Sequence, residues 1–301
     1  MNFGKILPFV AAVLAFANAF CDTKFAFVAH SRDCRECTAV FNGVRDALSE
    51  LSKKYAQTLS ADFIAAGAGS KSDALAKAHM AGYAGAVVVA SPDSDKSTAK
   101  FDAKNFPVAA VGFDNKNAFY FCATDTGAAF AAIKREIKRL SGSSKPEIFT
   151  YVPAAVNLNC PLEFPSFAAD FAKLRRTEKI GFYSDYAAKN ADAIRRRDDF
   201  GEIFAGVSML ANMAAIAEDS DRAFALCLGS IPQLEFYLKS GQIDACIYDD
   251  FYGWGYFAAR ALAEKALEGI SPKKREYFVK PAVATKENPN LLGSDWAKWG
   301  R

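Results

Sequence analysis

The chain has 301 residues, of which 51% are hydrophobic and 24% are charged, and its formal net charge is +3. This is the composition of an ordinary globular protein, long enough for one large domain or two smaller ones. The small net charge argues against nucleic acid or an anionic membrane surface as a partner.

The N-terminus has the pattern of a secretory signal peptide. Lys5 precedes an apolar run over residues 6–17, and Ala17-x-Ala19 supplies the small residues of a cleavage site. A retained membrane anchor would need about 20 apolar residues, more than this run offers. A lipid anchor on Cys21 is the other alternative, but the residues before it fit a lipobox poorly. We therefore predict cleavage after Ala19 and a periplasmic protein without a lipid anchor.

The seven cysteines all follow the predicted cleavage site, at positions 21, 34, 37, 122, 160, 227 and 246. An oxidising compartment allows disulfides, and an odd count leaves at least one cysteine outside intrachain pairs. The sequence does not assign the pairs.

The stretch 24–54 begins the folded part of the chain. Residues 25–29 are an apolar run of strand formers, and a polar loop follows over 30–37. Val40, Val44, Leu48 and Leu51 then recur at helical spacing. A strand buried on both faces and followed by an amphipathic helix indicates a parallel sheet covered by helices. In such sheets ligands lie beyond the carboxyl ends of the strands, where the 30–37 loop is expected.

The same alternation continues to the C-terminus, with strands roughly 20–30 residues apart, as right-handed βαβ crossovers require. Further strands are predicted at 58–66, 86–90, 107–113, 118–122, 147–152, 179–183, 202–207, 223–228, 243–248 and 277–284. Further helices are predicted at 70–80, capped by Ser70, and at 94–104, 164–174, 210–217, 232–240 and 256–267. Thr124-Asp125-Thr126 is predicted to cap another helix. The last residues, with Trp296 and Trp299, are predicted as a tail. The pattern indicates two βα domains of similar build.

Several weak motifs in a consistent order carry a resemblance to a known family. They are residues 24–29, 41–47, 86–94, 106–114, 124–127, 240–247, 263–269 and 283–288. In this order and spacing the chain resembles the type I periplasmic binding proteins of the ribose- and galactose-binding kind, whose fold is shared with repressor ligand domains.

The resemblance implies an α/β fold of two lobes. Each lobe would be a doubly wound parallel sheet, and a hinge of three crossings near Thr124, Asp249 and Pro281 would join them around a ligand cleft. With the signal peptide at 1–19, lobe 1 would comprise residues 20–123 plus 250–280, and lobe 2 residues 124–249 plus 281–301.

The sequence departs from the family where sugar contacts are expected. The family's first loop usually carries an Asn and a pair of Phe, whereas here it contains Asp33, Cys34, Glu36 and Cys37. The family's Asp-Arg pair near Gly112 is replaced by the nearest polar pair, at 114–115. The familiar pentose or hexose contacts are therefore not predicted for this chain.

A ligand between the lobes would be fixed by polar side chains of the strand-end loops and covered by aromatic ones. The 249–254 cluster is the best candidate, because it joins carboxylates to Tyr252 and Trp254 directly after a predicted buried strand. The excess of acids favours a cationic or hydroxyl-rich ligand. The predicted ligand-binding residues are Ser31, Arg32, Asp33, Glu36, Asp114, Asn115, Asn159, Asp185, Asp249, Asp250 and Trp254.

Cys34 and Cys37 form a C-x-x-C motif between a strand and a helix, the setting of a thioredoxin-like redox pair. The aromatic and Gly-Pro residues usual around such a motif are missing, and the chain is far longer than that fold. We predict that both cysteines are oxidised, to each other or to other cysteines, and serve structure. With His30 they would make an incomplete zinc set, so no metal is predicted.

Catalysis finds little support, because the chain has only two histidines and no nucleophile elbow, P-loop or dinucleotide-binding motif in a suitable place. The sequence predicts a monomeric periplasmic solute-binding protein without a cofactor. It would capture a small polar, sugar-like ligand for the permease of an ABC transporter. The alternatives are a ligand-sensing partner of a sensor kinase or chemoreceptor and, in another class, an exported C-x-x-C redox protein.

Overall fold

A computed structural model places ten stretches of the chain well enough for description. They are residues 22–67, 70–89, 105–112, 117–141, 148–151, 181–182, 224–229, 232, 234–241 and 243–300. The predicted signal peptide, the helices at 94–104, 164–174 and 210–217, and the strand at 202–207 lie outside them.

The chain divides into two compact units, and it passes from one to the other several times. Unit 1 comprises Met1–Arg32, Val40–Cys122 and Tyr252–Tyr277, and unit 2 comprises Asp33–Ala39, Ala123–Phe251 and Phe278–Arg301. The first turn of the helix after residue 34 thus groups with unit 2, although the rest of that helix belongs to unit 1.

The first sheet has six strands in the order β10-β5-β4-β3-β1-β2. Its strands are β1 (Thr23–Ala29), β2 (Leu59–Ala65), β3 (Ala86–Val89), β4 (Val108–Val111), β5 (Tyr120–Thr124) and β10 (Glu276–Val279). The pairs from β2 through β1, β3 and β4 to β5 are all parallel. The side chains of β3, β4 and β5 are buried along their whole length, as expected for a sheet covered on both faces.

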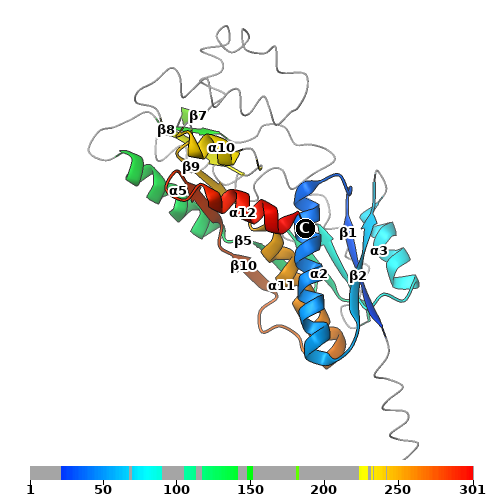
Figure 1. Cartoon of the computed structure of the whole chain (residues 1–301). Coiled ribbons are helices and arrows are strands. Elements are labelled where there is room, and N and C mark those ends of the chain that lie inside the picture. The colour runs from blue at the N-terminus through cyan, green and yellow to red at the C-terminus, as the bar shows by residue number, and fades with distance from the viewer. Residues whose placement is uncertain are drawn as a thin grey trace, which may run out of the picture. The chain divides into compact units, whose positions relative to one another are not determined.

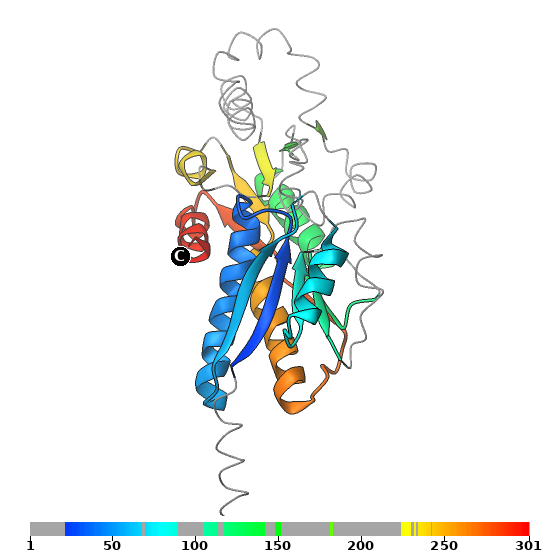
Figure 2. The same cartoon turned by 90° about the vertical axis from the view of Figure 1, so that its right-hand side faces the viewer.

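The helices of unit 1 cover this sheet. They are α2 (Arg35–Tyr55), α3 (Lys71–Met80) and α11 (Phe251–Glu268). Figures 1 and 2 show α2 and α3 on opposite faces of β1 and β2. The Ser70 hydroxyl accepts a hydrogen bond from the Ser72 N–H, which confirms the predicted start of α3.

Two glycines allow α2 and α11 to approach each other closely. A Cβ atom on Gly43 would lie 2.1 Å from the Tyr252 carbonyl oxygen, and one on Gly255 would lie 1.9 Å from the Val40 carbonyl oxygen. Since backbone atoms cannot move aside cheaply, only glycine fits at either position.

The second sheet belongs to unit 2 and has five strands in the order β11-β9-β8-β6-β7. Its strands are β6 (Ile148–Tyr151), β7 (Gly181–Phe182), β8 (Phe224–Leu228), β9 (Ala245–Tyr248) and β11 (Ala282–Thr285). All pairs are parallel except that of β11 with β9. The helices described in this unit are α5 (Thr126–Ser141), α10 (Leu234–Lys239) and α12 (Asn290–Trp299). The Asp125 carboxylate accepts the Ala128 N–H at 2.9 Å, which confirms the predicted start of α5.

The C-terminal segment is a helix rather than the predicted tail. In α12, Trp296 and Trp299 are buried, and the Trp299 ring meets the rings of Tyr248 and Phe251 edge to face at 6.0 and 5.7 Å. The Tyr248 hydroxyl donates to Asp295 Oδ2 at 2.7 Å, and burial raises the pKa of the Asp295 carboxyl group. The buried side chains of Leu292, Trp296 and Trp299 are spaced by four and three residues, which is a helical signal, but the aromatic partners Tyr248 and Phe251 lie far away in sequence.

Two further element boundaries differ from the prediction. The helix predicted at 256–267 begins at Phe251, and its first turns include Gly255, which lies against the backbone of α2. The strand predicted at 277–284 is two strands, β10 in the first sheet and β11 in the second, separated at Pro281. The predicted class, α/β with mostly parallel sheets, is confirmed. Among the described residues, no helix combines the length and the apolar character that crossing a membrane requires.

The close approach of α2 and α11 predicts that Gly255→Ala destabilises the protein. A methyl group 1.9 Å from the Val40 carbonyl oxygen forces the helices apart, and such overpacking costs about 1–3 kcal/mol or more of unfolding free energy. Gly127→Ala in α5 is the control, since its Cβ would meet only the Asp125 side chain, at 3.3 Å. Urea unfolding followed by circular dichroism measures both variants, and equal midpoints would contradict the packing described.

Candidate ligand-binding loops

Arg32 is the best-defined candidate residue in the loop after β1. Its Nη2 donates to the Phe63 carbonyl oxygen at 2.9 Å, near the carboxyl end of β2, and its guanidinium lies 5.1 Å from the centroid of the Phe63 ring. An arginine carries five N–H donors, so one backbone bond and one aromatic face fix its position while its remaining donors can serve a ligand. Ser31 lies beside it in the loop and is half-buried.

An aromatic cluster supports this loop from within unit 1. Phe27 of β1, Phe41 of α2 and Phe63 of β2 lie with ring centroids 5.0–5.3 Å apart in tilted and edge-to-face arrangements. Such pairs are worth about 0.5–1.5 kcal/mol beyond the area that they bury. The Phe63 ring on which Arg32 rests is therefore held by two neighbours.

Lys71 also lies at the carboxyl edge of the first sheet, although the sequence did not single it out. Its Nζ donates to the Val89 carbonyl oxygen at 2.7 Å, at the end of β3. Lys71 is the first residue of α3, and a helix start that follows a parallel strand is the only sequence signal for this placement.

The first turn of α2 holds the C-x-x-C motif. The Cys34 Sγ accepts the Cys37 N–H at 3.3 Å, and the Cys34 carbonyl oxygen accepts the Thr38 N–H at 3.0 Å. Glu36 is 5% exposed, and its Oε2 lies 3.6 Å from the Cys34 Sγ. The nearby Asp33 is exposed.

The oxidation states of the two cysteines differ. Cys34 is disulfide-bonded, and its partner lies outside the described side chains. Cys37 is a thiol, as are Cys122 and Cys246. A Cys34–Cys37 disulfide, one of the two pairings left open by the sequence, is therefore not present, and the prediction that Cys37 is oxidised is wrong in this structure. Sequence spacing cannot supply the distances to more remote cysteines that decide between pairings.

Asp249 is buried and hydrogen-bonded in this structure. It is 1% exposed, and its Oδ1 accepts a hydrogen bond of 2.5 Å from the Thr124 hydroxyl, which is also buried. A buried carboxylate requires such donors. The bond joins the last residue of β5 to the residue that follows β9. Asp250 is half-buried beside it.

Of the two aromatic residues predicted to stack on the ligand, Trp254 is buried and Tyr252 is half-buried. Trp254 is 1% exposed in the first turn of α11 and belongs to the core. The Tyr252 hydroxyl donates to Asp46 Oδ2 of α2 at 2.7 Å, so Tyr252 joins two helices. Because the predicted loop is a helix, these side chains follow a helical rather than a loop arrangement. The remaining candidates Asp114, Asn115, Asn159 and Asp185 lie outside the described residues.

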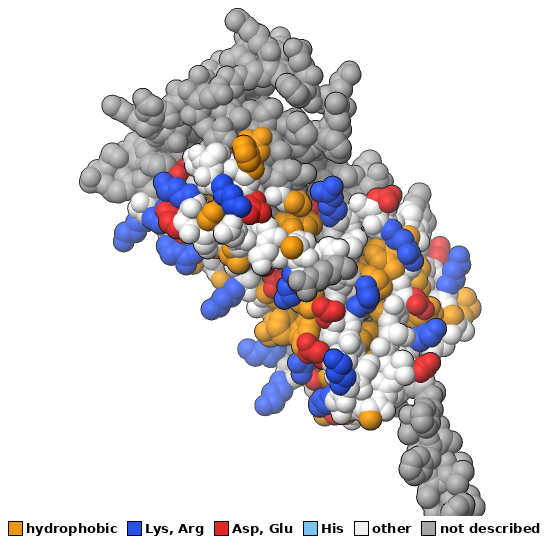
Figure 3. Space-filling view, viewed as in Figure 1, with side chains coloured by type: hydrophobic (Ala, Val, Ile, Leu, Met, Phe, Trp, Pro, Cys, Tyr) orange, Lys and Arg blue, Asp and Glu red, His pale blue; other side chains and the backbone are white. Residues whose placement is uncertain are grey.

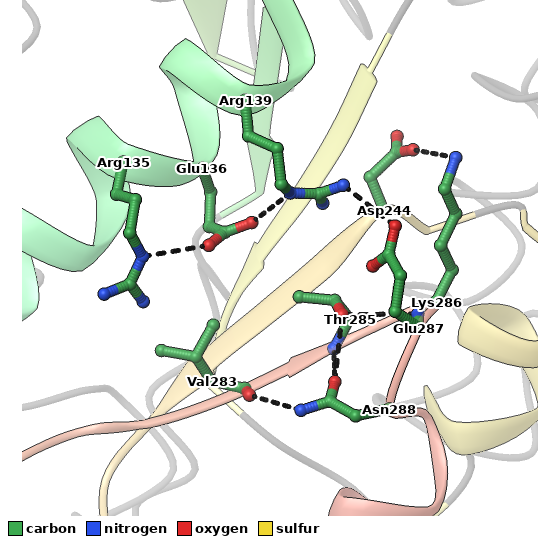
Figure 4. Close-up of polar contacts among 9 residues, drawn as sticks. All are labelled: Arg135, Glu136, Arg139, Asp244, Val283, Thr285, Lys286, Glu287 and Asn288. Carbon is green, nitrogen blue, oxygen red and sulfur yellow. Dashed lines mark hydrogen bonds and ion pairs between the residues drawn. The ribbon is translucent and has the colours of Figure 1, made fainter.

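Charged side chains on unit 2 form ion pairs around two buried carboxylates, those of Glu136 and Asp244. Arg139 of α5 contacts Glu136 at 2.7 Å and Glu287 at 3.1 Å, and Lys286 lies 4.0 Å from Asp244 (Figure 4). Figure 3 shows both signs of charge interspersed over the described atoms of the visible face. Within the described parts, no group of three or more His, Cys, Asp or Glu side chains could hold a metal ion.

The chain is similar to known proteins in structure but matches none in sequence. No protein-family model matches the sequence, and no curated protein matches it significantly. The chain is similar to GanP, a glucose-galactose binding protein from Geobacillus stearothermophilus, with 16% identity and a TM-score of 0.61 over 89% of this chain and 99% of that one. It is also similar to an ABC transporter solute binding protein from Agrobacterium vitis with bound allitol, with 12% identity and a TM-score of 0.63 over 91% and 98%.

The chain has the fold of the type I periplasmic binding proteins. A third similar structure, the XylFII–LytSN complex, has 13% identity and a TM-score of 0.59 over 89% of this chain and 99% of that one. All three likenesses extend over nearly the whole chain. The type I fold expected from the sequence motifs is therefore confirmed.

The buried bond at the end of β5 predicts the effect of removing one hydroxyl group. Thr124→Val keeps the side-chain shape but removes the donor to Asp249, which should cost about 1–3 kcal/mol of unfolding free energy. Thr126→Val is the matched control, because no interaction of the Thr126 hydroxyl is present in the described structure. Urea unfolding of both variants tests this. A Thr124→Val protein as stable as Thr126→Val would show that the bond contributes nothing.

Proposed function

We propose that the chain is an exported solute-binding protein that captures a small, hydroxyl-rich, sugar-like ligand between two lobes. The observation that carries this proposal is the whole-length likeness to proteins described as binding glucose and galactose or holding allitol, which covers 98–99% of those chains. A single domain shared with a larger enzyme would not produce a likeness over both units. The proposed activity is therefore binding without turnover and without a cofactor.

The proposed ligand contacts come from loops at the carboxyl ends of the strands. Arg32 and Ser31 contribute from the loop after β1, where the Phe63 platform fixes the guanidinium. Asp33 and Asp250 are accessible enough to join them. We include the predicted residues Asp114, Asn115, Asn159 and Asp185 because they follow strands of the same sheets. Arginine donors paired with carboxylate and amide acceptors suit a ligand with several hydroxyl groups.

The proposed partner is the permease of an ABC transporter, to which a monomeric periplasmic protein would deliver its ligand. The second candidate is a membrane sensor that reads the liganded protein. The XylFII–LytSN complex supports this second candidate, because in it a protein of similar fold binds a second protein. A permease gene beside the coding sequence supports delivery, and a kinase or chemoreceptor gene supports sensing.

The ligand proposal predicts that sugars or polyols bind and that Arg32 contributes to their affinity. Mass spectrometry of ligand released from the purified protein identifies candidates, and isothermal titration calorimetry measures their affinity. Arg32→Ala should weaken binding by about tenfold to a hundredfold, the effect of losing hydrogen bonds worth about 1–3 kcal/mol.

Arg260→Ala is the control, since Arg260 lies in α11 and pairs with Glu264 of the same helix. Its affinity should equal that of the wild type. Failure of a broad panel of sugars and polyols to bind, with none released, would overturn the proposed ligand class. Binding that is unchanged in Arg32→Ala would overturn the assigned loop.

A further inference from the structure

β10 is an edge strand of the first sheet. Among the described strands of that sheet, its neighbour is β5. The carbonyl oxygens of Arg275 and Val279 each accept an N–H at 2.8 Å, from β5 and from the residue that follows it. Because backbone groups alternate in direction along a strand, residues 276 and 278 turn theirs towards the other edge. β10 is thus placed to accept a further strand.

Two aromatic side chains of β10 are exposed, one on each face of the sheet. Tyr277 is 41% exposed and Phe278 is 49% exposed. They are consecutive residues of the strand, so their side chains point to opposite faces. The Tyr277 ring rests against the ring of Phe257 in α11, with the centroids 4.4 Å apart. An added strand brings side chains to both faces of a sheet, whereas a flat surface such as a membrane meets one face, so this arrangement favours a strand.

Basic side chains flank β10 before and after. Three exposed lysines make up these flanks: Lys273, Lys274 and Lys280. Glu276, the acidic residue of the strand, pairs with Arg275 at 3.2 Å. Since Arg275 offsets the charge of Glu276, the lysines leave residues 273–280, which we call the β10 strip, positively charged.

The lysines determine what kind of strand can be added. Two copies of β10 paired antiparallel about Tyr277 would bring Lys274 of one copy opposite Lys280 of the other, and like charges directly opposite each other are destabilising. Lysines at a sheet edge commonly prevent pairing of this kind. A strand with carboxylates at both ends meets the same lysines with opposite charge. The basic flanks therefore select an acidic strand over a second copy of this chain.

We propose that the β10 strip is a docking site for an extended acidic segment of a partner protein, which adds beside β10 as a further strand. Main-chain hydrogen bonds with residues 276 and 278 give the affinity of such strand addition, and side chains give its specificity. Apolar side chains of the segment pack beside Tyr277 and Phe278. Carboxylates about six positions apart face Lys274 and Lys280. This goes beyond solute binding, and its test does not require the solute.

The test uses a synthetic peptide as the probe and the intact mature protein. The peptide carries a pair of glutamates at each end and alternating valine and threonine over about five positions between them. Fluorescence anisotropy of a dye on the peptide measures its affinity. Amide hydrogen exchange followed by mass spectrometry shows where it binds. We expect binding with slower exchange over residues 276–280.

Two control peptides separate the contributions of charge and backbone. Replacing the glutamates by lysines should weaken binding at least about tenfold, because attraction to the flanks becomes repulsion. A proline at the centre removes a ladder hydrogen bond and should weaken binding to a similar extent. Equal binding of either control peptide would overturn the proposed mode of docking.

Matched variants of the protein test the lysines. Lys274→Glu combined with Lys280→Glu should bind the acidic peptide about tenfold more weakly, since two cross-strand charge pairs are reversed. Lys53→Glu combined with Lys77→Glu is the control, because it makes the same change in net charge at exposed positions of α2 and α3. It should bind as the wild type.

The proposal is overturned if the acidic peptide fails to bind at about 1 mM, or if it binds equally to the Lys274→Glu, Lys280→Glu protein. Slower exchange elsewhere in the chain, with none over residues 276–280, would also overturn it. Cosedimentation with phosphatidylglycerol vesicles in place of peptide binding would assign the strip to a lipid surface and contradict a protein partner.

Discussion

A buried hydrogen bond from Thr124 to Asp249 holds together the ends of two strands that are far apart in the sequence, β5 and β9. Thr124 ends β5, after which the chain continues into α5, and Asp249 follows β9, just before the chain leaves unit 2 for α11. Both side chains are buried. Because a buried carboxylate that loses its donor costs more than the bond itself contributes, this pair specifies how the two segments meet. The Asp125 carboxylate beside it fixes the start of α5.

Much of the fold could be predicted because its signals are local. Short apolar runs identified β1, β3 and β4, and the side chains of Ser70 and Asp125 marked the starts of α3 and α5 as expected. What failed depended on contacts between distant residues. The helix was predicted only from residue 256, whereas α11 begins at Phe251, and its Gly255 lies where the backbone of α2 comes close. A contact with a distant segment cannot be predicted from the residues of α11 alone.

The candidate site was harder to predict, because the exposure of a side chain depends on residues far from it in the sequence. Asp249 and Trp254 have the chemistry of ligand contacts, but one is held by Thr124 and the other lies in the core of unit 1. Arg32 stays a candidate because it lies on the Phe63 ring at the strand ends with donors to spare. Two residues further along, Cys34 directly precedes α2. The loop after β1 thus carries proposed ligand contacts.

The central claim is that a sugar-like ligand is held by loops of both lobes. Such a ligand must favour a closed form, because only there does it touch both sets of loops, and the shift cannot exceed its differential affinity for the two forms. Small-angle X-ray scattering with and without saturating ligand tests this most directly. The account predicts a smaller radius of gyration in the liganded protein, as in hinge closure. Saturation of the protein by a tightly bound sugar or polyol with an unchanged radius of gyration would contradict it.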